Sequence, residues 1–297
     1  MKYRFIDQQK GTHSVSLLCR ALGVSPQAYY QWRKRELSPR RRNNEALIER
    51  IRSVHQSSRR TYGSPRVHRE LRAQGVQCSR KRVARLMRAH GVRAKTVRRF
   101  RVTTDSAHAL PVASNLLDRQ FTVATPNRAW VTDITYVPTR EGWLYLCVFL
   151  DLFSRRVVGW AMSERMTAEL VTSALSMAVQ QRHPGTGLLI HSDRGSQYAS
   201  ELYQRHLSVH QFVCSMSRKG NCWDNSVAES FFHTLKGELI HHADYQTRAQ
   251  ARTEIFEFIE VFYNRTRHHS TLDYQPPLLF ERQHEQKQQQ TQARLAA

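Results

Sequence analysis

The chain has 297 residues and a formal net charge of +22, with 46 lysines and arginines against 24 aspartates and glutamates. Residues 1–101 hold 27 of the basic and 5 of the acidic residues, so this third carries the whole net charge. Such a distribution indicates an arm that binds a polyanion, with a cationic membrane-binding arm as the alternative. Five scattered cysteines without a CxxC pair, and no apolar run long enough to span a bilayer, argue against a disulfide framework, a zinc site and a membrane protein. We expect a soluble, cytoplasmic protein.

Residues 1–36 have the pattern of a helix-turn-helix domain. Leu17, Leu18 and Leu22 are followed by a break at Gly23, and Ser25 then offers an N-cap with Pro26 at the first helical position. An ordinary helical hairpin is the alternative interpretation. If the second helix faces DNA, the side chains expected to reach it are Gln27, Tyr30, Gln31 and Arg33.

Residues 37–93 repeat this logic in a second basic unit. A helix with Val67 and Leu71 stops at Gly75, and Ser79 caps another helix that ends at Gly91. Its dense cations predict phosphate contacts rather than base reading, unless they only form a solvated helix face. These predicted DNA contacts are Arg80, Lys81, Arg82 and Arg85.

Residues 94–127 lack periodicity and predict a connector, with a short helix near residues 115–119. Residues 128–281 predict an α/β catalytic core with a C-terminal helix. Three strands joined by short links are followed by helix, strand, helix, strand and helix, which is the order of a ribonuclease H-like fold with a mixed five-stranded sheet. Residues 282–297 are rich in glutamine and predict a disordered tail.

Three carboxylates stand out within the core. Asp133 interrupts a run of β-branched and aromatic residues, and Asp193 follows the short apolar strand that begins at Leu188. Glu229 lies one turn inside a helix whose start carries the N-cap types Asp224 and Asn225. Three acids from a mid-strand, a strand end and a helix fit two-metal phosphoryl transfer, because Mg²⁺ prefers oxygen ligands.

The phrases WVTDITY, HSDRGSQY and DNSVAESFFHTLK, with 35 residues between Asp193 and Glu229, resemble the catalytic core of insertion-sequence transposases related to retroviral integrases. The resemblance is closest to second-frame products of two-frame bacterial elements and extends to YNRTRHHSTLDYQPPLLFE near Pro277. It implies that Asp133, Asp193 and Glu229 are the catalytic, metal-binding acids of a DDE transposase. The implied cofactor is two Mg²⁺ ions, for which Mn²⁺ can substitute.

The same resemblance implies double-stranded DNA as the substrate. It implies cleavage at the element's terminal inverted repeats, joining of the ends into a circular intermediate, and insertion into target DNA. A homo-oligomer on DNA, and an upstream-frame protein or a frameshift fusion with it, are the implied protein partners. A DNA-binding regulator derived from a transposase and a structure-specific nuclease of the same fold are the alternative functions.

Further DNA contacts are expected close to the acids. Lys236 follows Glu229 by two helical turns on nearly the same face and could hold a flanking phosphate, as the family's basic residue there does; a solvated lysine is the alternative. Arg218 and Lys219 lie in a segment that could touch the DNA backbone or could be a plain connector. His268 and His269 adjoin each other, so we expect a structural or DNA-contacting role for them rather than metal ligation.

Overall fold

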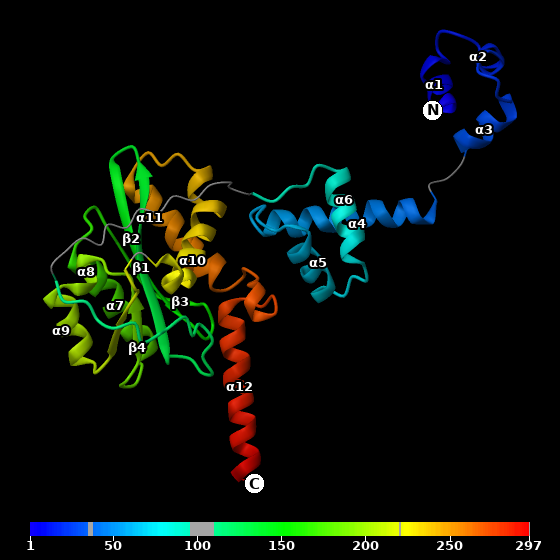
Figure 1. Cartoon of the computed structure of the whole chain (residues 1–297). Helices are drawn as coiled ribbons and strands as arrows, with labels where there is room; N and C mark the ends of the chain where they lie inside the picture. Colours follow the sequence, from blue (N-terminus) through cyan, green and yellow to red (C-terminus); the bar gives the residue numbers. More distant parts are fainter. Residues whose placement is uncertain (35–37, 96–109, 220, 297) are drawn as a thin grey trace.

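The computed structural model describes residues 1–34, 38–95, 110–219 and 221–296, which form two small helical domains and an α/β core (Figure 1). The core is built on a five-stranded sheet in the order β3-β2-β1-β4-β5. Its strands are β1 (Ala129–Thr139), β2 (Gly142–Asp151), β3 (Val157–Ser163), β4 (Leu189–Ser192) and β5 (Val213–Met216). The first three strands pair antiparallel, whereas β4 is parallel to β1 and to β5. This mixed sheet confirms the ribonuclease H-like order expected from the sequence.

Helices cover both faces of the sheet (Figure 1). The first face carries α7 (Ala168–Arg182), α8 (Ser196–Ala199) and α9 (Glu201–Val209), and the second carries α10 (Ser226–Glu238) and α11 (Arg248–Glu257). Alternate residues of β1 serve the two faces, since Trp130 packs against the α7 side and Val131 against the α10 side. A side chain at Gly159 of β3 would lie 2.5 Å from the Ala174 carbonyl oxygen, so glycine is what lets α7 lie this close to the sheet.

Two local predictions in the core need correction. The single helix expected between the last two strands is two helices, α8 and α9, because the Ser200 side chain caps α9 by accepting a hydrogen bond from the Tyr203 amide. The short helix expected near residues 115–119 is a turn instead. There the Leu116 and Leu117 amides donate to the Ser215 hydroxyl rather than to a helical ladder.

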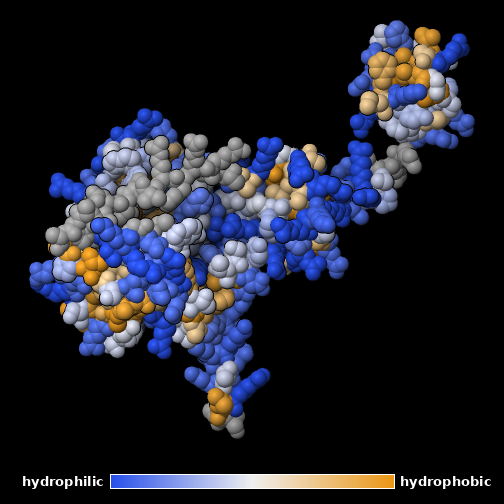
Figure 2. Space-filling view, in the orientation of Figure 1, coloured by the Kyte–Doolittle hydropathy of each residue, from blue (hydrophilic) through white to orange (hydrophobic). Residues whose placement is uncertain are grey.

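The chain ends in a long helix, α12 (Pro277–Ala296), where the sequence predicted a disordered tail over residues 282–297. Glutamine, glutamate, lysine and arginine are good helix formers, so a polar run continues the helix that Pro277 begins. Most of α12 is exposed and hydrophilic (Figure 2).

The first helical domain consists of α1 (Lys2–Gln9), α2 (Val15–Ala21) and α3 (Pro26–Lys34). Its small core contains Ile6, Leu18, Cys19 and Tyr29. The predicted cap is present, because the Ser25 hydroxyl accepts a hydrogen bond from the Ala28 amide at 3.0 Å. This domain stands apart from the rest of the chain in Figure 1.

The second helical domain consists of α4 (Pro39–Ser57), α5 (Ser64–Ala73) and α6 (Arg80–Ala89). Its core includes the predicted apolar residues Val67 and Leu71, together with Val83, Leu86 and Met87 of α6. Ser79 caps α6 as expected, accepting a hydrogen bond from the Arg82 amide. None of the helices within the described ranges is both long and apolar enough to cross a membrane.

Candidate active site and nucleic-acid interface

The sheet register brings Asp133 level with Asp193. In the parallel pairing of β1 with β4, Val131 lies opposite His191. Two residues further along each strand, Asp133 is still in β1 and Asp193 directly follows β4. Backbone amides orient both carboxylates, since Ile134 N–H donates to Asp133 at 2.8 Å and Gly195 N–H donates to Asp193 at 2.9 Å. Two acids that lie 60 residues apart in sequence are therefore neighbours in the sheet.

Glu229 comes to the same face of the sheet on α10. Val131 and Val137 pack on the α10 side, and the two-residue period of a strand places Asp133 on that side too. Glu229 is the fourth residue of α10. The start of this helix is tied to β1 beside Asp133, because the Asn225 amide donates to the Thr132 carbonyl at 3.1 Å.

The electrostatics of Asp133 show that the other two carboxylates act on it. Burial raises the pKa of Asp133 well above its usual value, and the charges of Asp193 and, less strongly, Glu229 raise it further. Burial also raises the pKa of Glu229. The charge of Lys236 has the opposite effect and lowers the pKa of Asp133.

Lys236 is half-buried beside these acids. Burial lowers its pKa, while the charge of Asp133 raises it. The ammonium group lies 4.7 Å from the centre of the Tyr136 ring, a cation–π distance. The lysine is therefore held at the acidic site and is not a freely solvated side chain.

The chemistry of the donor set fits a hard divalent cation. The site offers only carboxylate oxygens, and the mutual repulsion that raises the pKa of Asp133 is what a bound cation would relieve. Among the described residues, however, no three His, Cys, Asp or Glu side chains already form a group that could hold a metal ion. The acids converge on one face without forming a closed cage, as suits an ion that keeps waters and substrate oxygens as ligands.

A buried polar network underlies Asp133 and Asp193. The hydroxyls of Thr132 and Tyr198 lie 3.1 Å apart, with the Cys147 thiol within 3.6 Å of Thr132. Burial raises the pKa of Tyr198 well above normal, so this phenol stays protonated. A side chain at Gly195 would crowd this site, because its Cβ would lie 3.0 Å from the Gln197 side-chain oxygen and 3.1 Å from a carboxylate oxygen of Asp193.

Asp224 has a structural role that the sequence did not reveal. It is fully buried and accepts hydrogen bonds from the side chains of Arg119, Arg218 and Asn115 and from the Arg218 amide. The hydrogen bond from Arg218 is the main reason that its pKa is far below normal. The sequence offered Asp224 only as a helix-cap type. The Arg218 guanidinium, expected at DNA, binds Asp224 and is still 48% exposed, and Lys219 is exposed as well.

The histidine that precedes Asp193 by two residues is buried and neutral. Its two ring nitrogens lie 2.8 Å from the Ser215 hydroxyl and 3.1 Å from the Ser217 hydroxyl. Burial lowers the pKa of His191 to about 4. This pair of contacts joins β4 to the end of β5, and only the position of His191 at the end of an apolar strand could have signalled it. His269 is partly buried, and burial lowers its pKa to about 3.

The predicted contact residues of the first domain share one helix and are exposed. Tyr29 and Trp32 turn inward and are in contact with each other, at 6.2 Å between ring centroids. The opposite side of α3 faces outward with Gln27, Tyr30 and Gln31, whereas Arg33 is exposed one turn after Tyr29, 3.7 Å from the Asp7 carboxylate.

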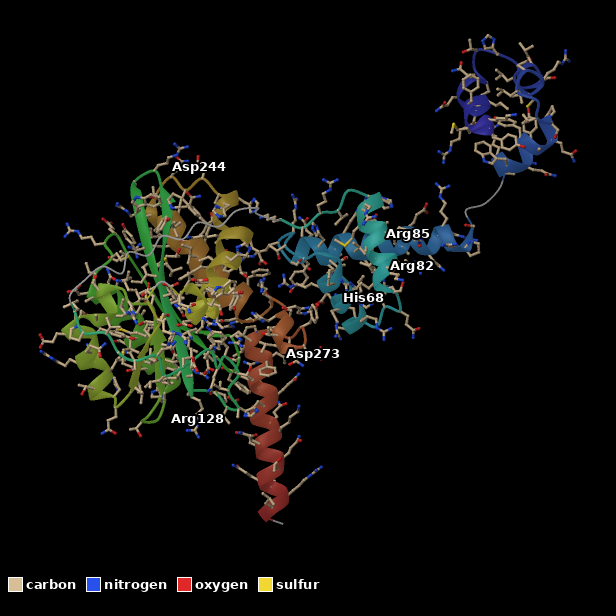
Figure 3. All side chains as sticks on the ribbon, in the orientation of Figure 1. His68, Arg82, Arg85, Arg128, Asp244 and Asp273 are labelled. Carbon is tan, nitrogen blue, oxygen red and sulfur yellow. The ribbon has the colours of Figure 1, made fainter. Side chains whose placement is uncertain are left out.

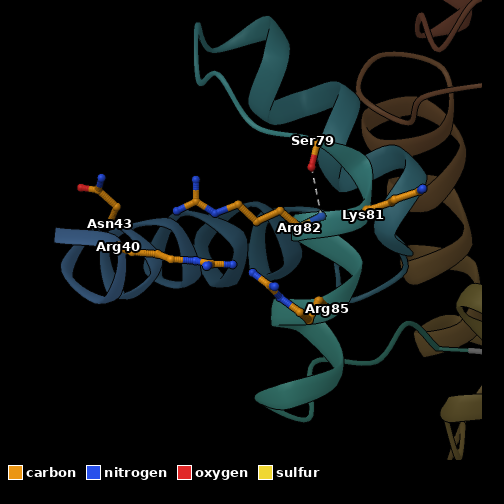
Figure 4. Close-up of a pocket in the computed structure, with 6 residues that line it drawn as sticks. All are labelled: Arg40, Asn43, Ser79, Lys81, Arg82 and Arg85. Carbon is orange, nitrogen blue, oxygen red and sulfur yellow. Dashed lines mark hydrogen bonds between the residues drawn. The ribbon is translucent and has the colours of Figure 1, made fainter. Parts of the chain in front are cut away.

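The second domain has a basic pocket between α4 and α6, with a volume of about 600 Å³ (Figure 4). Its lining residues are Arg40, Asn43, Ser79, Lys81, Arg82 and Arg85. No acidic residue lines it, and Arg82 is fixed by a 2.9 Å hydrogen bond to the Asn44 side chain. Figure 3 shows Arg82 and Arg85 projecting from the same helix. Of the four cations predicted to bind phosphate, three line this basic pocket, and Arg80 is exposed at the start of α6.

Comparisons with known proteins agree with this architecture. The integrase core domain family matches residues 124–222, and a second integrase core domain family matches residues 210–277. An HTH-like domain family matches residues 42–100, and a transposase family matches residues 1–56.

Relatives and solved structures were also found. The chain is 43% identical to "Transposase InsF for insertion sequence IS3A" of Escherichia coli, over 95% of this chain and 98% of that protein. It is 45% identical to the "Insertion element IS600 uncharacterized 31 kDa protein" of Shigella sonnei, over 91% of this chain and 99% of that protein. The catalytic core of HTLV-2 integrase in complex with magnesium covers 53% of this chain and 97% of its own length, at 16% identity and a TM-score of 0.42. Near-complete coverage at 43% identity shows that this chain belongs to the family of insertion-sequence transposases with an integrase core.

Proposed function

We propose that this transposase cleaves the ends of its own insertion element and joins them to target DNA with Asp133, Asp193 and Glu229 as its metal-binding catalytic acids. The observation that carries the proposal is their convergence. The β1–β4 register aligns two of the acids, and α10 delivers the third to the same face. A fold has no structural use for an aspartate whose pKa is raised by two further carboxylates, whereas polynucleotidyl transfer needs such a group of acids.

The proposed cofactor is Mg²⁺, bound as two ions by the three acids, with Mn²⁺ as a substitute. When bound, such ions activate the attacking oxygen and stabilise the leaving oxygen of an in-line displacement. The residues of the chain supply the rest. The backbone amides of Ile134 and Gly195 orient the two aspartates by hydrogen bonds. The Tyr198 phenol belongs to the buried polar network beneath them and stays protonated.

Lys236 would hold the phosphate next to the one being cleaved. It projects from α10 two turns after Glu229, and the Tyr136 ring and the charge of Asp133 keep its ammonium group near the acids. A phosphodiester that is fixed there would stay in line with the attacking oxygen. Lys219 is exposed in the preceding segment and can contact the DNA backbone, while Arg218 positions that segment through Asp224.

The two helical domains would bind the terminal inverted repeats. The basic pocket suits a DNA phosphate, because Arg40, Lys81, Arg82 and Arg85 surround a space open to solvent. The exposed side of α3 is the better candidate for base contacts, since it carries glutamines and a tyrosine in addition to Arg33. A homo-oligomer on DNA and a frameshift fusion with an upstream-frame protein belong to the same proposal.

The proposal is tested by incubating the full chain with labelled element ends and MgCl₂, and then resolving nicked and strand-transferred products. Wild-type protein should give both products, whereas Asp193→Asn and Glu229→Gln should give neither and should still shift the DNA in a gel. Glu201→Gln is the matched control, because Glu201 is an exposed acid on α9 paired only at the surface. Cleavage by either active-site variant would remove that residue from the site. Nicking without joining by the wild type would favour a nuclease.

A further inference from the structure

The second helical domain is docked on the core through a buried tyrosine. Tyr62 is 3% exposed, and its hydroxyl donates to the Thr266 carbonyl at 3.2 Å while it accepts from the His268 amide at 2.7 Å. The Tyr62 and His268 rings also contact each other, with centroids 5.5 Å apart. We call residues 263–274 the docking segment. Tyr62, which contacts this segment, also belongs to the core of the second helical domain.

Ion pairs complete this contact around the tyrosine. Arg267 of the docking segment is 4% exposed and binds Glu238 through two nitrogens, at 2.7 and 2.8 Å. Arg66 on α5 approaches the same carboxylate at 3.6 Å, and Glu70 one turn later lies 3.1 Å from the His268 imidazole. At the exposed rim Arg69 pairs with Asp273, which Figure 3 shows on the side of the core that faces the second domain.

The docked contact connects directly to the catalytic helix. Glu238 is the last residue of α10, nine residues after Glu229, so about 14 Å of rigid helix separates the two carboxylates. On the other side, Tyr62 packs in the same core as Val83, Leu86 and Met87 of α6, the helix that carries Lys81, Arg82 and Arg85 of the basic pocket. An unbroken series of packed elements thus runs from the basic pocket to the active site.

We propose that this docking contact acts as a ruler: it fixes the distance along the DNA between the phosphate held in the basic pocket and the phosphodiester cleaved at the acids. Tyr62, Arg66 and Glu70 are then positioning residues for cleavage, although they touch neither the reacting bond nor the acids. The inference rests on the proposed function, because it requires that the acids cleave the DNA that the second domain binds. It gives the docking segment a purpose other than metal or DNA binding.

The docking itself is tested by hydrogen exchange on the full chain. Tyr62→Phe keeps the aromatic ring in the domain core and removes only the hydroxyl, so the domain should remain folded. The His268 amide loses its acceptor and should exchange faster, together with its neighbours in the docking segment. Asp273→Asn is the matched control, because it neutralises only a rim pair and asparagine tolerates the left-handed backbone of that residue. Unchanged exchange in Tyr62→Phe would show that the contact is absent in solution.

The ruler is tested with element ends that carry one extra base pair between the footprint of the second domain and the cleavage position. One base pair shifts the scissile phosphate by about 3.4 Å. For the wild type, this should reduce cleavage at the natural end ~100-fold, because a misplacement of about 1 Å can already cost that much. Glu70→Lys should cleave the natural end poorly, and its cleavage rate should fall by less than about tenfold further on the extended end. The double variant Glu70→Lys with His268→Glu should restore the wild-type cleavage of the natural end and the wild-type penalty for the extra base pair.

The outcomes separate the two proposals. No Mg²⁺-dependent cleavage by the wild type would refute the proposed function. Wild-type cleavage that is equally efficient on both substrates, or a Glu70→Lys variant that retains the full penalty for the extra base pair, would refute the ruler and leave the active site intact. Gel shifts on each variant should show unchanged DNA affinity, since none of these residues lines the basic pocket.

Discussion

Two groups of acids lie along the sheet and differ in what surrounds them: Asp151 and Glu281, which are buried, and the partly buried Asp133, Asp193 and Glu229. Trp130 pairs with Asp151 and Asp133 pairs with Val148, so three strand residues, or roughly 10 Å, separate the groups along the sheet. Glu281 of α12 is held by Arg156, Arg182 and the Ser154 hydroxyl, and Arg182 also reaches Asp151. Asp133, by contrast, faces Asp193 and Glu229, with Lys236 as the cation that acts on it.

The pKa shifts of Glu281 and Asp133 run in opposite directions, although burial acts to raise both. Burial by itself raises the pKa of Glu281, yet Arg182, Ser154 and Arg156 together hold it below its usual value. Burial and like charges both raise the pKa of Asp133. The first group therefore stabilises the charged protein and anchors α12, whereas the second costs stability until a cation from outside the chain arrives.

The largest effect on the free energy of unfolding is expected from removing the charge of Glu281, whose carboxylate is paired with arginines. Glu281→Gln leaves Arg182 and Arg156 buried without their main counter-charge and should lower the free energy of unfolding by ~3–5 kcal/mol. Urea unfolding at pH 7.5 measures this. Glu285→Gln, one turn further along α12 and exposed, should change the same quantity by less than about 0.5 kcal/mol. A loss below ~1 kcal/mol in Glu281→Gln would mean that the arginines find other partners.

A pH titration of stability extends the comparison to the buried histidine beside Asp193. His191 has a pKa lowered to about 4, against about 6.5 in an unfolded chain, so the unfolded state binds the extra proton between these values. The stability of the wild type should therefore fall as the pH drops from about 6.5 to about 4, by up to about 3 kcal/mol from this residue. His191→Gln should be less stable at pH 7.5 but should lose less on acidification. An identical pH slope in that variant would contradict the neutral, buried state.

In the group of Asp133, Asp193 and Glu229, which has too few counter-charges, a neutral substitution should raise the free energy of unfolding. Asp133→Asn removes a buried charge that Asp193 and Glu229 repel, and the new amide oxygen can still accept from the Ile134 amide. Without metal, the variant should be more stable than the wild type by ~1 kcal/mol while it loses all cleavage. Urea unfolding in EDTA is the measurement. A lower stability of Asp133→Asn would show that repulsion from Asp193 and Glu229 does not destabilise the wild type.

The smallest effect on stability is expected at Lys236. Lys236→Ala loses a cation–π contact and a weak attraction to Asp133, so the free energy of unfolding should fall by no more than ~1 kcal/mol. Strand transfer should nevertheless drop ~10-fold or more, because the scissile phosphate is no longer held in line. Lys236→Arg should retain much of the joining activity. Normal joining rates in Lys236→Ala would reduce this lysine to a structural role.

The sequence predicted those features that depend on local pattern. Asp133 stood out because an aspartate is a poor strand former among β-branched neighbours, and Ser25 and Ser79 were identifiable as caps from their place before a helix. It could not predict features that depend on pairing between distant segments. The partners of Asp224 include residues more than 100 positions away, and Tyr62 meets a backbone 204 residues later. Neither pairing has a local signal.

Asp133, Asp193 and Glu229 form a site in which the carboxylates repel Asp133 until a divalent cation binds. The most direct test is the unfolding temperature of the wild type and of Asp193→Asn as MgCl₂ is added at pH 7.5, with CaCl₂ and equal ionic strength of NaCl as controls. The wild type should gain stability with Mg²⁺ in a saturable way that NaCl does not reproduce, as binding to the folded state alone requires. Asp193→Asn should not respond. A wild type that is indifferent to Mg²⁺, or an Asp193→Asn variant that is stabilised equally, would contradict the account.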